Sequence, residues 1–308
     1  MPPSTARSRK PTEKAAAAAA AAPAKRQKEA AEPPPAPAPS RPADQKTDSA
    51  AASAISSAAV PAKAQIEAYE RDGYLHVTGF YNEAEVGMLR AFLKEVEKAP
   101  DRVGSYMKYF ETSSKGGVRI LQRVEDFCRR HEGFAGLLAR PETSGLVQFA
   151  QRLLGSDLVL FKDKVNFKLP GGDGFKAHQD QAAGWGNYIS WFVSIGIFID
   201  PSTKKNGCLE VSAGKHREGL LGKEWEPIED LPLPYEAVEC APGDIIIFDS
   251  FVPHRSAPNT SDRARRAMFM TYSRKDEGDR LADYFRDKRR DFPPDIERPE
   301  GVEYVYRV

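Results

Sequence analysis

The second half of the chain alternates short apolar runs with tight-turn sequences, and this pattern restricts the fold more than any other feature. Between residues 158 and 169, apolar and polar side chains alternate with a period of two, as in a strand with one apolar and one polar face. Further strands are expected at 190–199, 245–248 and 267–273, and Asn206-Gly207 predicts a hairpin turn. We therefore expect a mainly β domain with flanking helices, arranged as a double-sheet jelly roll and not as a parallel α/β fold.

The flanking helices are predicted from their capping and periodicity. Residues 64–71 form a short amphipathic pattern that ends at Asp72-Gly73, and residues 74–77 predict a strand. Asn82-x-x-Glu85 is a capping-box pattern that opens a helix to about residue 97. A helix at 144–154 ends at Gly155, and a surface helix is expected at 279–288.

Residues 101–132 show no clear period. An aromatic and charged stretch, 106–111, precedes a flexible stretch at 113–117. A long irregular segment in a compact domain is often a lid or binding loop, so we predict a substrate-specificity region here.

Residues 1–61 contain no aromatic residue and no Leu, and are dominated by Ala, Pro and Ser. Such a segment cannot bury enough apolar surface to offset its ordering entropy. We predict a disordered Ala/Pro-rich tail at 1–61, with a role in targeting as the alternative to a solvated spacer, and one folded domain at 62–308.

Composition limits the partners and the compartment. The 45 Lys and Arg balance 44 Asp and Glu, which predicts neither nucleic-acid nor membrane binding, and no apolar run is long enough to span a bilayer. The three cysteines have no C-x-x-C spacing, which favours a reducing environment. We expect an intracellular, cytoplasmic protein and make no prediction of its oligomeric state.

His178 and Asp180 are the strongest candidates for a metal site. In an extended strand, side chains at i and i+2 lie on the same face, so this pair presents an imidazole and a carboxylate together. A second histidine would complete a facial triad that leaves three coordination positions open on iron. His254, which follows an apolar strand, is the candidate for this third ligand.

Eleven residues after His254, Arg265 precedes another apolar strand. A guanidinium group binds a carboxylate through two hydrogen bonds and keeps its charge, as the far carboxylate of 2-oxoglutarate requires. Arg263 and Arg266 are the alternatives; Arg266 would face the other side of the strand.

With these residues the chain from about Ala62 to Arg274 resembles the phytanoyl-CoA dioxygenase family of iron(II)/2-oxoglutarate oxygenases. The resemblance lies in the segments His178-Gln179-Asp180, 206–216, 242–244 and 254–259, and in Arg265. It implies a double-stranded β-helix, or cupin-like, fold with His178, Asp180 and His254 as iron ligands and catalytic residues. It also implies that Arg265, with Asn166 and Lys164, binds 2-oxoglutarate.

The resemblance implies iron(II) as cofactor, 2-oxoglutarate and O2 as co-substrates, and stimulation by ascorbate. Because Asp180 is present where halogenating relatives have a small residue, we expect a hydroxylase. The chain is most similar to members that act on small polar metabolites such as aminophosphonates. Lys108, Lys176, Trp185 and Tyr188 are the candidate substrate-binding residues, although packing and a solvated surface explain each of them as well.

Two other functions remain open from the sequence. The substrate could be carried on coenzyme A or on a carrier protein. Alternatively, the domain could be a cupin-like module that binds a ligand without turnover, although retention of all four motif residues disfavours this.

Overall fold

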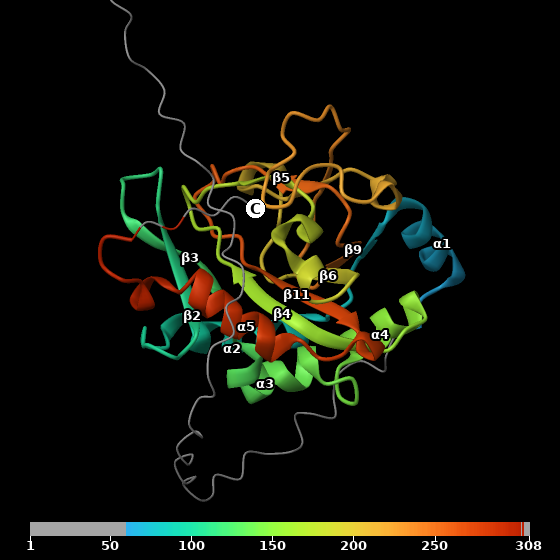
Figure 1. The fold of residues 1–308 in the computed structure, drawn as a ribbon, viewed down its shortest axis with the longest axis horizontal. Helices are drawn as coiled ribbons and strands as arrows, with labels where there is room; N and C mark the ends of the chain where they lie inside the picture. Colours follow the sequence, from blue (N-terminus) through green and yellow to red (C-terminus); the bar gives the residue numbers. More distant parts are fainter. Residues whose placement is uncertain (1–59, 303, 305–308) are drawn as a thin grey trace, which may run out of the picture. The chain divides into compact units, whose positions relative to one another are not determined.

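The computed structural model describes residues 60–302 and residue 304 (Figure 1). The predicted tail, 1–61, lies outside these residues except for Val60 and Pro61, so both its disorder and the domain boundary remain predictions. Among the described residues, no helix has the length and apolar character needed to cross a bilayer.

The N-terminal elements follow the sequence prediction closely. Helix α1 (Lys63–Asp72) ends at Gly73, whose φ of 77° is left-handed, and strand β1 (Tyr74–Val77) follows. Helix α2 (Glu83–Lys98) begins with both bonds of the capping box: Glu85 N donates to Asn82 Oδ1 at 3.0 Å, and Asn82 N donates to Glu85 Oε2 at 2.7 Å. Helix α4 (Gly145–Leu154) is capped by Ser144 and ends at Gly155.

Two antiparallel sheets make up the body of the domain. The larger has the order β1, β9 (Ile245–Asp249), β6 (Phe192–Phe198), β11 (Ala267–Arg274), β4 (Leu158–Asn166), β3 (Arg119–Glu125) and β2 (Met107–Thr112). The smaller has the order β5 (Phe175–His178), β10 (His254–Ser256), β7 (Leu209–Val211) and β8 (Glu236–Val238). Consecutive strands of the chain repeatedly belong to different sheets, and the predicted jelly roll is confirmed.

Short helices and turns connect these strands. They are α3 (Glu132–Phe134), a π-helical turn at Ala135–Ala139, and 3₁₀ turns at Cys128–Arg130, Asp180–Ala183, Trp185–Asn187, Lys204–Asn206, Lys215–Glu218, Lys275–Glu277 and Asp295–Glu297.

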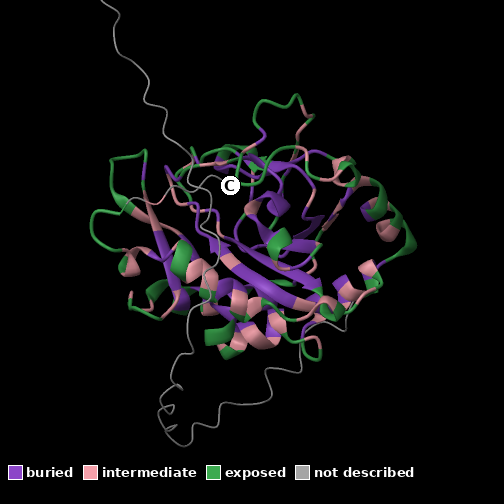
Figure 2. Ribbon diagram, in the orientation of Figure 1, coloured by how far each residue is buried: buried purple, intermediate pink, exposed green. Residues whose placement is uncertain are grey.

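The two faces of the large sheet bury different side chains. The outer face packs against α2 and α4 in one apolar core, which includes Ile195, Ile247 and Met270. The inner face contributes Phe248 and Phe269 to a second core with residues of the small sheet. Figure 2 shows the long central strands almost entirely buried, with exposed residues mainly on helices and loops. Because side chains alternate along a strand, each residue's position decides which face it serves.

Three sequence predictions need correction. Residues 101–132 are not an irregular lid, because most of them form the hairpin of β2 and β3, which extends the large sheet. Asn206-Gly207 does not join two paired strands: β6 lies in the large sheet and β7 in the small one, so this turn carries the chain between sheets. Helix α5 (Leu281–Asp291) is not merely a surface helix, since it buries Tyr284 and Phe285 in an aromatic cluster beside β4.

Candidate active site

Strand pairing brings the two predicted histidine ligands together. In the small sheet β10 lies beside β5, with His254 directly opposite His178. The centroids of the two imidazole rings are 4.3 Å apart. Asp180 completes the group, because its Oδ1 lies 3.8 Å from the Nε2 atom of each histidine. All three side chains are buried, and their donor atoms lie within 4.8 Å of one another.

Backbone carbonyls orient both histidines. The Nδ1 atom of His178 donates to Lys176 O at 2.6 Å, and that of His254 donates to Val252 O at 3.0 Å. Since a carbonyl only accepts, Nδ1 carries the proton and the Nε2 lone pair of each ring is left to bind a metal. Burial lowers the pKa of both histidines, which keeps the imidazoles neutral, as metal ligation requires.

Asp180 is held by a serine that the sequence did not single out. Strand β5 ends at His178, but Gln179 is still extended, with φ −110° and ψ 135°, so Asp180 stays on the same side as His178. Ser194 Oγ donates to Asp180 Oδ2 at 2.8 Å and lies 3.1 Å from Thr271 Oγ1. Burial alone would raise the pKa of Asp180, but electrostatic interactions with His254, Lys164 and His178 and the hydrogen bond from Ser194 lower it instead.

These residues fit iron(II). Two imidazoles and one carboxylate, without a thiolate, form the donor set of non-haem iron oxygenases, whose remaining positions are left for co-substrates. The hydrogen bonds from His178 Nδ1 to Lys176 O and from Ser194 Oγ to Asp180 Oδ2 hold these side chains in position without a metal.

The predicted 2-oxoglutarate residues line the same cavity as the iron ligands. Arg265, Asn166 and Lys164 all border it, together with Phe175 and Phe269. Arg265 Nη2 donates to Gly207 O. Arg265 Nε and Asn166 Oδ1, although buried, have no hydrogen-bond partner among residues 60–302 and 304. Buried polar atoms are normally paired, so these two atoms indicate a ligand with both donor and acceptor groups, or an ordered water.

The neighbouring arginines are placed differently. Arg266 forms a bidentate ion pair with Asp200, with N–O distances of 2.7 and 2.9 Å, and does not line the cavity. Arg263 is exposed. The structure therefore favours Arg265 as the co-substrate residue, and this role remains our proposal.

The four predicted substrate-binding residues do not line this cavity. Lys108 is on the outer face of the large sheet, where its Nζ donates to Glu97 O and Ala99 O at the end of α2. Lys176 is exposed, and its Nζ lies 3.4 Å from Glu229.

The two aromatic candidates, Trp185 and Tyr188, pack around Phe161. Trp185 is buried in the aromatic cluster, and Tyr188 donates from its hydroxyl to Asp287 Oδ2 at 3.0 Å. Both rings are therefore packing residues of this cluster, which is the alternative that the sequence left open.

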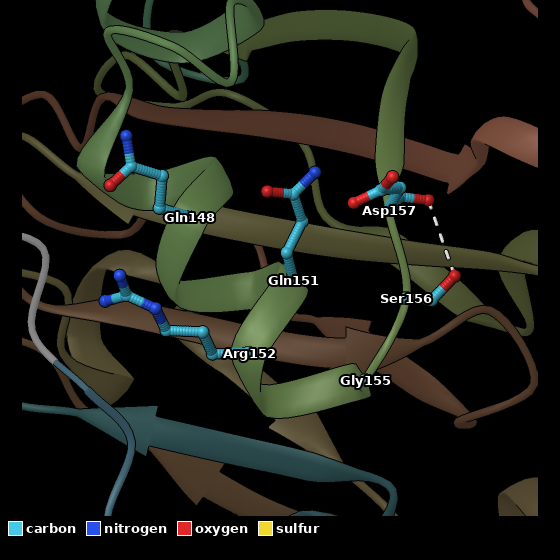
Figure 3. Close-up of a pocket in the computed structure, with 6 residues that line it drawn as sticks. All are labelled: Gln148, Gln151, Arg152, Gly155, Ser156 and Asp157. Carbon is cyan, nitrogen blue, oxygen red and sulfur yellow. Dashed lines mark hydrogen bonds between the residues drawn. The ribbon is translucent and has the colours of Figure 1, made fainter.

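Two other features of the described chain do not form a second active site. His76, Cys240 and Asp244 lie close together, but the Asp244 carboxylate already accepts hydrogen bonds from Gly79 N and Ala241 N in a turn. Figure 3 shows an open surface concavity at the end of α4, formed by a few polar residues around Gly155 and without any of the iron ligands.

Comparison with known proteins agrees with this geometry. Residues 69–267 match the family model described as phytanoyl-CoA dioxygenase. The chain is 42% identical to a 2-aminoethylphosphonate dioxygenase from an uncultured bacterium (HF130_AEPn_1), over 77% of this chain and 90% of the relative. It is 34% identical to a methylphosphonate hydroxylase from Gimesia maris, over 74% of this chain and 86% of the relative.

Among solved structures, the fold is similar to that of EctD from S. alaskensis with 2-oxoglutarate and 5-hydroxyectoine. The TM-score is 0.59 at 22% identity, and the match covers 70% of this chain and 77% of EctD. The family match, the jelly roll and the clustered His178, Asp180 and His254 agree with one another. The chain thus belongs to the phytanoyl-CoA dioxygenase family and is an iron(II)- and 2-oxoglutarate-dependent dioxygenase.

Proposed function

We propose that this dioxygenase hydroxylates a small organophosphonate, with an aminophosphonate such as 2-aminoethylphosphonate as the first candidate. The observation that carries the proposal is the composition of the iron cavity, where a lysine, Lys164, and an arginine, Arg265, stand beside the three ligands. Such a cavity suits two anionic molecules, the co-substrate and an anionic substrate. The two relatives described above are named for phosphonates, and the phosphonate group is what their substrates share.

In this proposal each cavity residue has a definite task. His178, Asp180 and His254 would hold iron(II), and Arg265 would donate its unpaired Nε–H to the far carboxylate of 2-oxoglutarate, with Asn166 lining the same part of the cavity. When bound, the iron allows O2 and 2-oxoglutarate to convert a C–H bond to C–OH, with succinate and CO2 as the other products.

The apolar wall supports this chemistry. Phe175, Phe248 and Phe269 line the cavity beside the ligands. They exclude bulk water, which strengthens electrostatic contacts inside the cavity and protects the reaction from side products. Ser194 keeps the carboxylate of Asp180 in one orientation while substrates enter.

The alternatives predicted from the sequence are less well supported. Both relatives are named for phosphonates, and neither name includes coenzyme A or a carrier protein. A binding module without turnover would also have no need for three ligands whose free Nε2 and Oδ1 atoms converge on one point.

The test is succinate formation by the purified protein with iron(II), ascorbate and 2-oxoglutarate. 2-Aminoethylphosphonate, methylphosphonate, β-alanine and an acyl-coenzyme A are supplied separately, and the hydroxylated product is identified by mass. We expect one succinate per hydroxylated phosphonate and no product with Asp180→Ala. Coupled turnover of the acyl-coenzyme A alone would refute the proposal.

A further inference from the structure

The inner face of β4 carries three polar side chains in a row. Asn166, Lys164 and Lys162 are spaced by two residues, so their side chains point the same way, about 7 Å apart from one to the next. Pairing with β11 fixes their order relative to the site: Asn166 is opposite Ala267, Lys164 opposite Phe269 and Lys162 opposite Thr271. Lys162 is therefore at the end of the row farthest from the Arg265 side.

The neighbours of Lys162 connect it to the iron ligands. Thr271, its cross-strand partner, contacts Ser194, which donates to Asp180 Oδ2. Lys162 is thus joined to the ligand Asp180 through Thr271 and Ser194, although it does not itself line the iron cavity.

Lys162 is a buried ammonium group that forms no salt bridge with any described residue. Its residue is 6% exposed, and within the described chain its Nζ makes no hydrogen bond and no ion pair. Its contacts are with aromatic rings, since Nζ lies 5.1 Å from the ring centroid of Trp185 and 5.6 Å from that of Tyr284. Cation–π contacts contribute little compared with the cost of removing an ammonium from water.

Three more cations lie near Lys162. Lys288 reaches in from α5 and lies 3.4 Å from Glu125 Oε2, while Arg123 Nε donates to Glu125 Oε1 at 2.8 Å. Lys164 is on the adjacent position of β4, opposite Glu125 of β3. The carboxylate of Glu125 therefore interacts with four cationic side chains: Lys288, Lys162, Arg123 and Lys164.

The charge imbalance leaves these cations incompletely stabilised. Burial, together with Lys162, Arg123 and Lys164, lowers the pKa of Lys288 to about 7 against the opposing effect of Glu125. An added anion would reduce this repulsion, and a dianion would do so more than a monoanion.

We propose that Lys162 and Lys288 form the receptor for the dianionic phosphonate group of the substrate, with Trp185 and Tyr284 as the wall behind it. This assignment rests on the proposed function and specifies the residues that would select a phosphonate over a carboxylate.

The test compares Lys162→Gln, Lys288→Gln and the control Lys94→Gln, which removes the same charge from an exposed position on α2. Each of the first two should raise KM for 2-aminoethylphosphonate roughly 10- to 100-fold, as expected for lost hydrogen bonds to a charged group. The control should leave KM unchanged, and no variant should change the 2-oxoglutarate requirement. Lys162→Arg should recover part of the loss.

Binding is measured separately from turnover. Methylphosphonate and inorganic phosphate are titrated anaerobically into protein loaded with iron(II) and 2-oxoglutarate, and the visible absorption band is followed. Both anions should perturb the band of the wild type and bind more weakly to Lys162→Gln, while acetate should have little effect on either protein.

The outcomes separate the two proposals. No coupled turnover of any phosphonate by the wild type would overturn the proposed function. Wild-type turnover with unchanged KM and phosphate binding in both Lys162→Gln and Lys288→Gln would overturn the receptor alone. If Lys162→Gln does not fold, the same comparison is decided by Lys162→Arg and Lys288→Gln.

Discussion

Ser194→Ala removes one hydroxyl from the centre of the molecule and should weaken iron(II) binding. Ser194 Oγ donates to Asp180 Oδ2 at 2.8 Å, on the carboxylate oxygen that does not face the two histidines. Without this bond the carboxylate can rotate, and its second oxygen is left buried with one partner fewer. The backbone of β6 is unaffected, because Ala fits an interior strand position.

The magnitude follows from the type of bond. A hydrogen bond to a charged group contributes about 1.5–3 kcal/mol, and about 1.4 kcal/mol corresponds to a factor of ten. Some of this loss is recovered if Thr271 Oγ1, 3.1 Å from the serine, turns toward the carboxylate. We therefore expect the Kd for iron(II) to rise roughly 10- to 100-fold, the range usual when a residue that hydrogen-bonds to a metal ligand is replaced.

The assay is an anaerobic titration of iron(II) in the presence of 2-oxoglutarate, followed by the visible absorption band of the complex. Ser273→Ala is the matched control: Ser273 is also fully buried, on the neighbouring strand β11, but its Oγ has no hydrogen-bond partner among the described residues. We expect it to bind iron like the wild type. Equal affinity of Ser194→Ala and Ser273→Ala would refute the claim that Ser194 positions the ligand.

Other substitutions test the remaining assignments. Arg265→Ala should raise the 2-oxoglutarate concentration for half-maximal succinate formation by roughly 10-fold or more. Arg266→Ala, which loses only its ion pair with Asp200, should leave this concentration unchanged. The reverse result would assign the co-substrate role to Arg266. Asp163 gives a pH prediction, because burial and then Asp126 raise its pKa from 3.8 to about 7. The folded protein then holds a proton that the unfolded chain releases, so the stability of the wild type relative to Asp163→Asn should fall as pH rises from about 4 to 7. Urea unfolding at pH 5 and pH 8 measures this difference, and parallel curves would contradict it.

The strands and helices that the sequence predicted are those with an uninterrupted apolar run or a clear cap. Strand β6, which is buried along its whole length, has such a run, and helix α2 has such a cap. The hairpin of β2 and β3 was missed because both of its faces are buried and both carry charged residues: Lys108 packs outward, and Arg123 and Glu125 point inward. Alternation between polar and apolar residues is lost when charges are satisfied inside the protein.

The sequence could bring the three candidate iron ligands together because two of them are only two residues apart and the third follows a recognisable strand and turn. The residues that support them could not. Ser194 belongs to an apolar run in which one hydroxyl has no distinguishing pattern, and Lys288 comes from a helix that the sequence places on the surface. Their roles depend on strand register and helix packing, which only the assembled fold determines.

Lys108 and Lys162 show how strongly register decides function. Both are buried lysines in strands of the large sheet, and the sequence around each is aromatic and charged. Lys108 falls on the outer face and is held by carbonyl groups of α2, so its charge is already stabilised by the fold. Lys162 falls on the inner face, next to a β-bulge. Thr271 pairs with Lys162, but the next residue of β11 pairs with Leu160, so Phe161 is an extra residue in β4. The insertion lets Phe161 join Trp185 in the aromatic cluster that walls off the ammonium group. A buried cation whose charge the fold balances only in part is stabilised when an anion binds beside it, and this is the position that we propose for the phosphonate group.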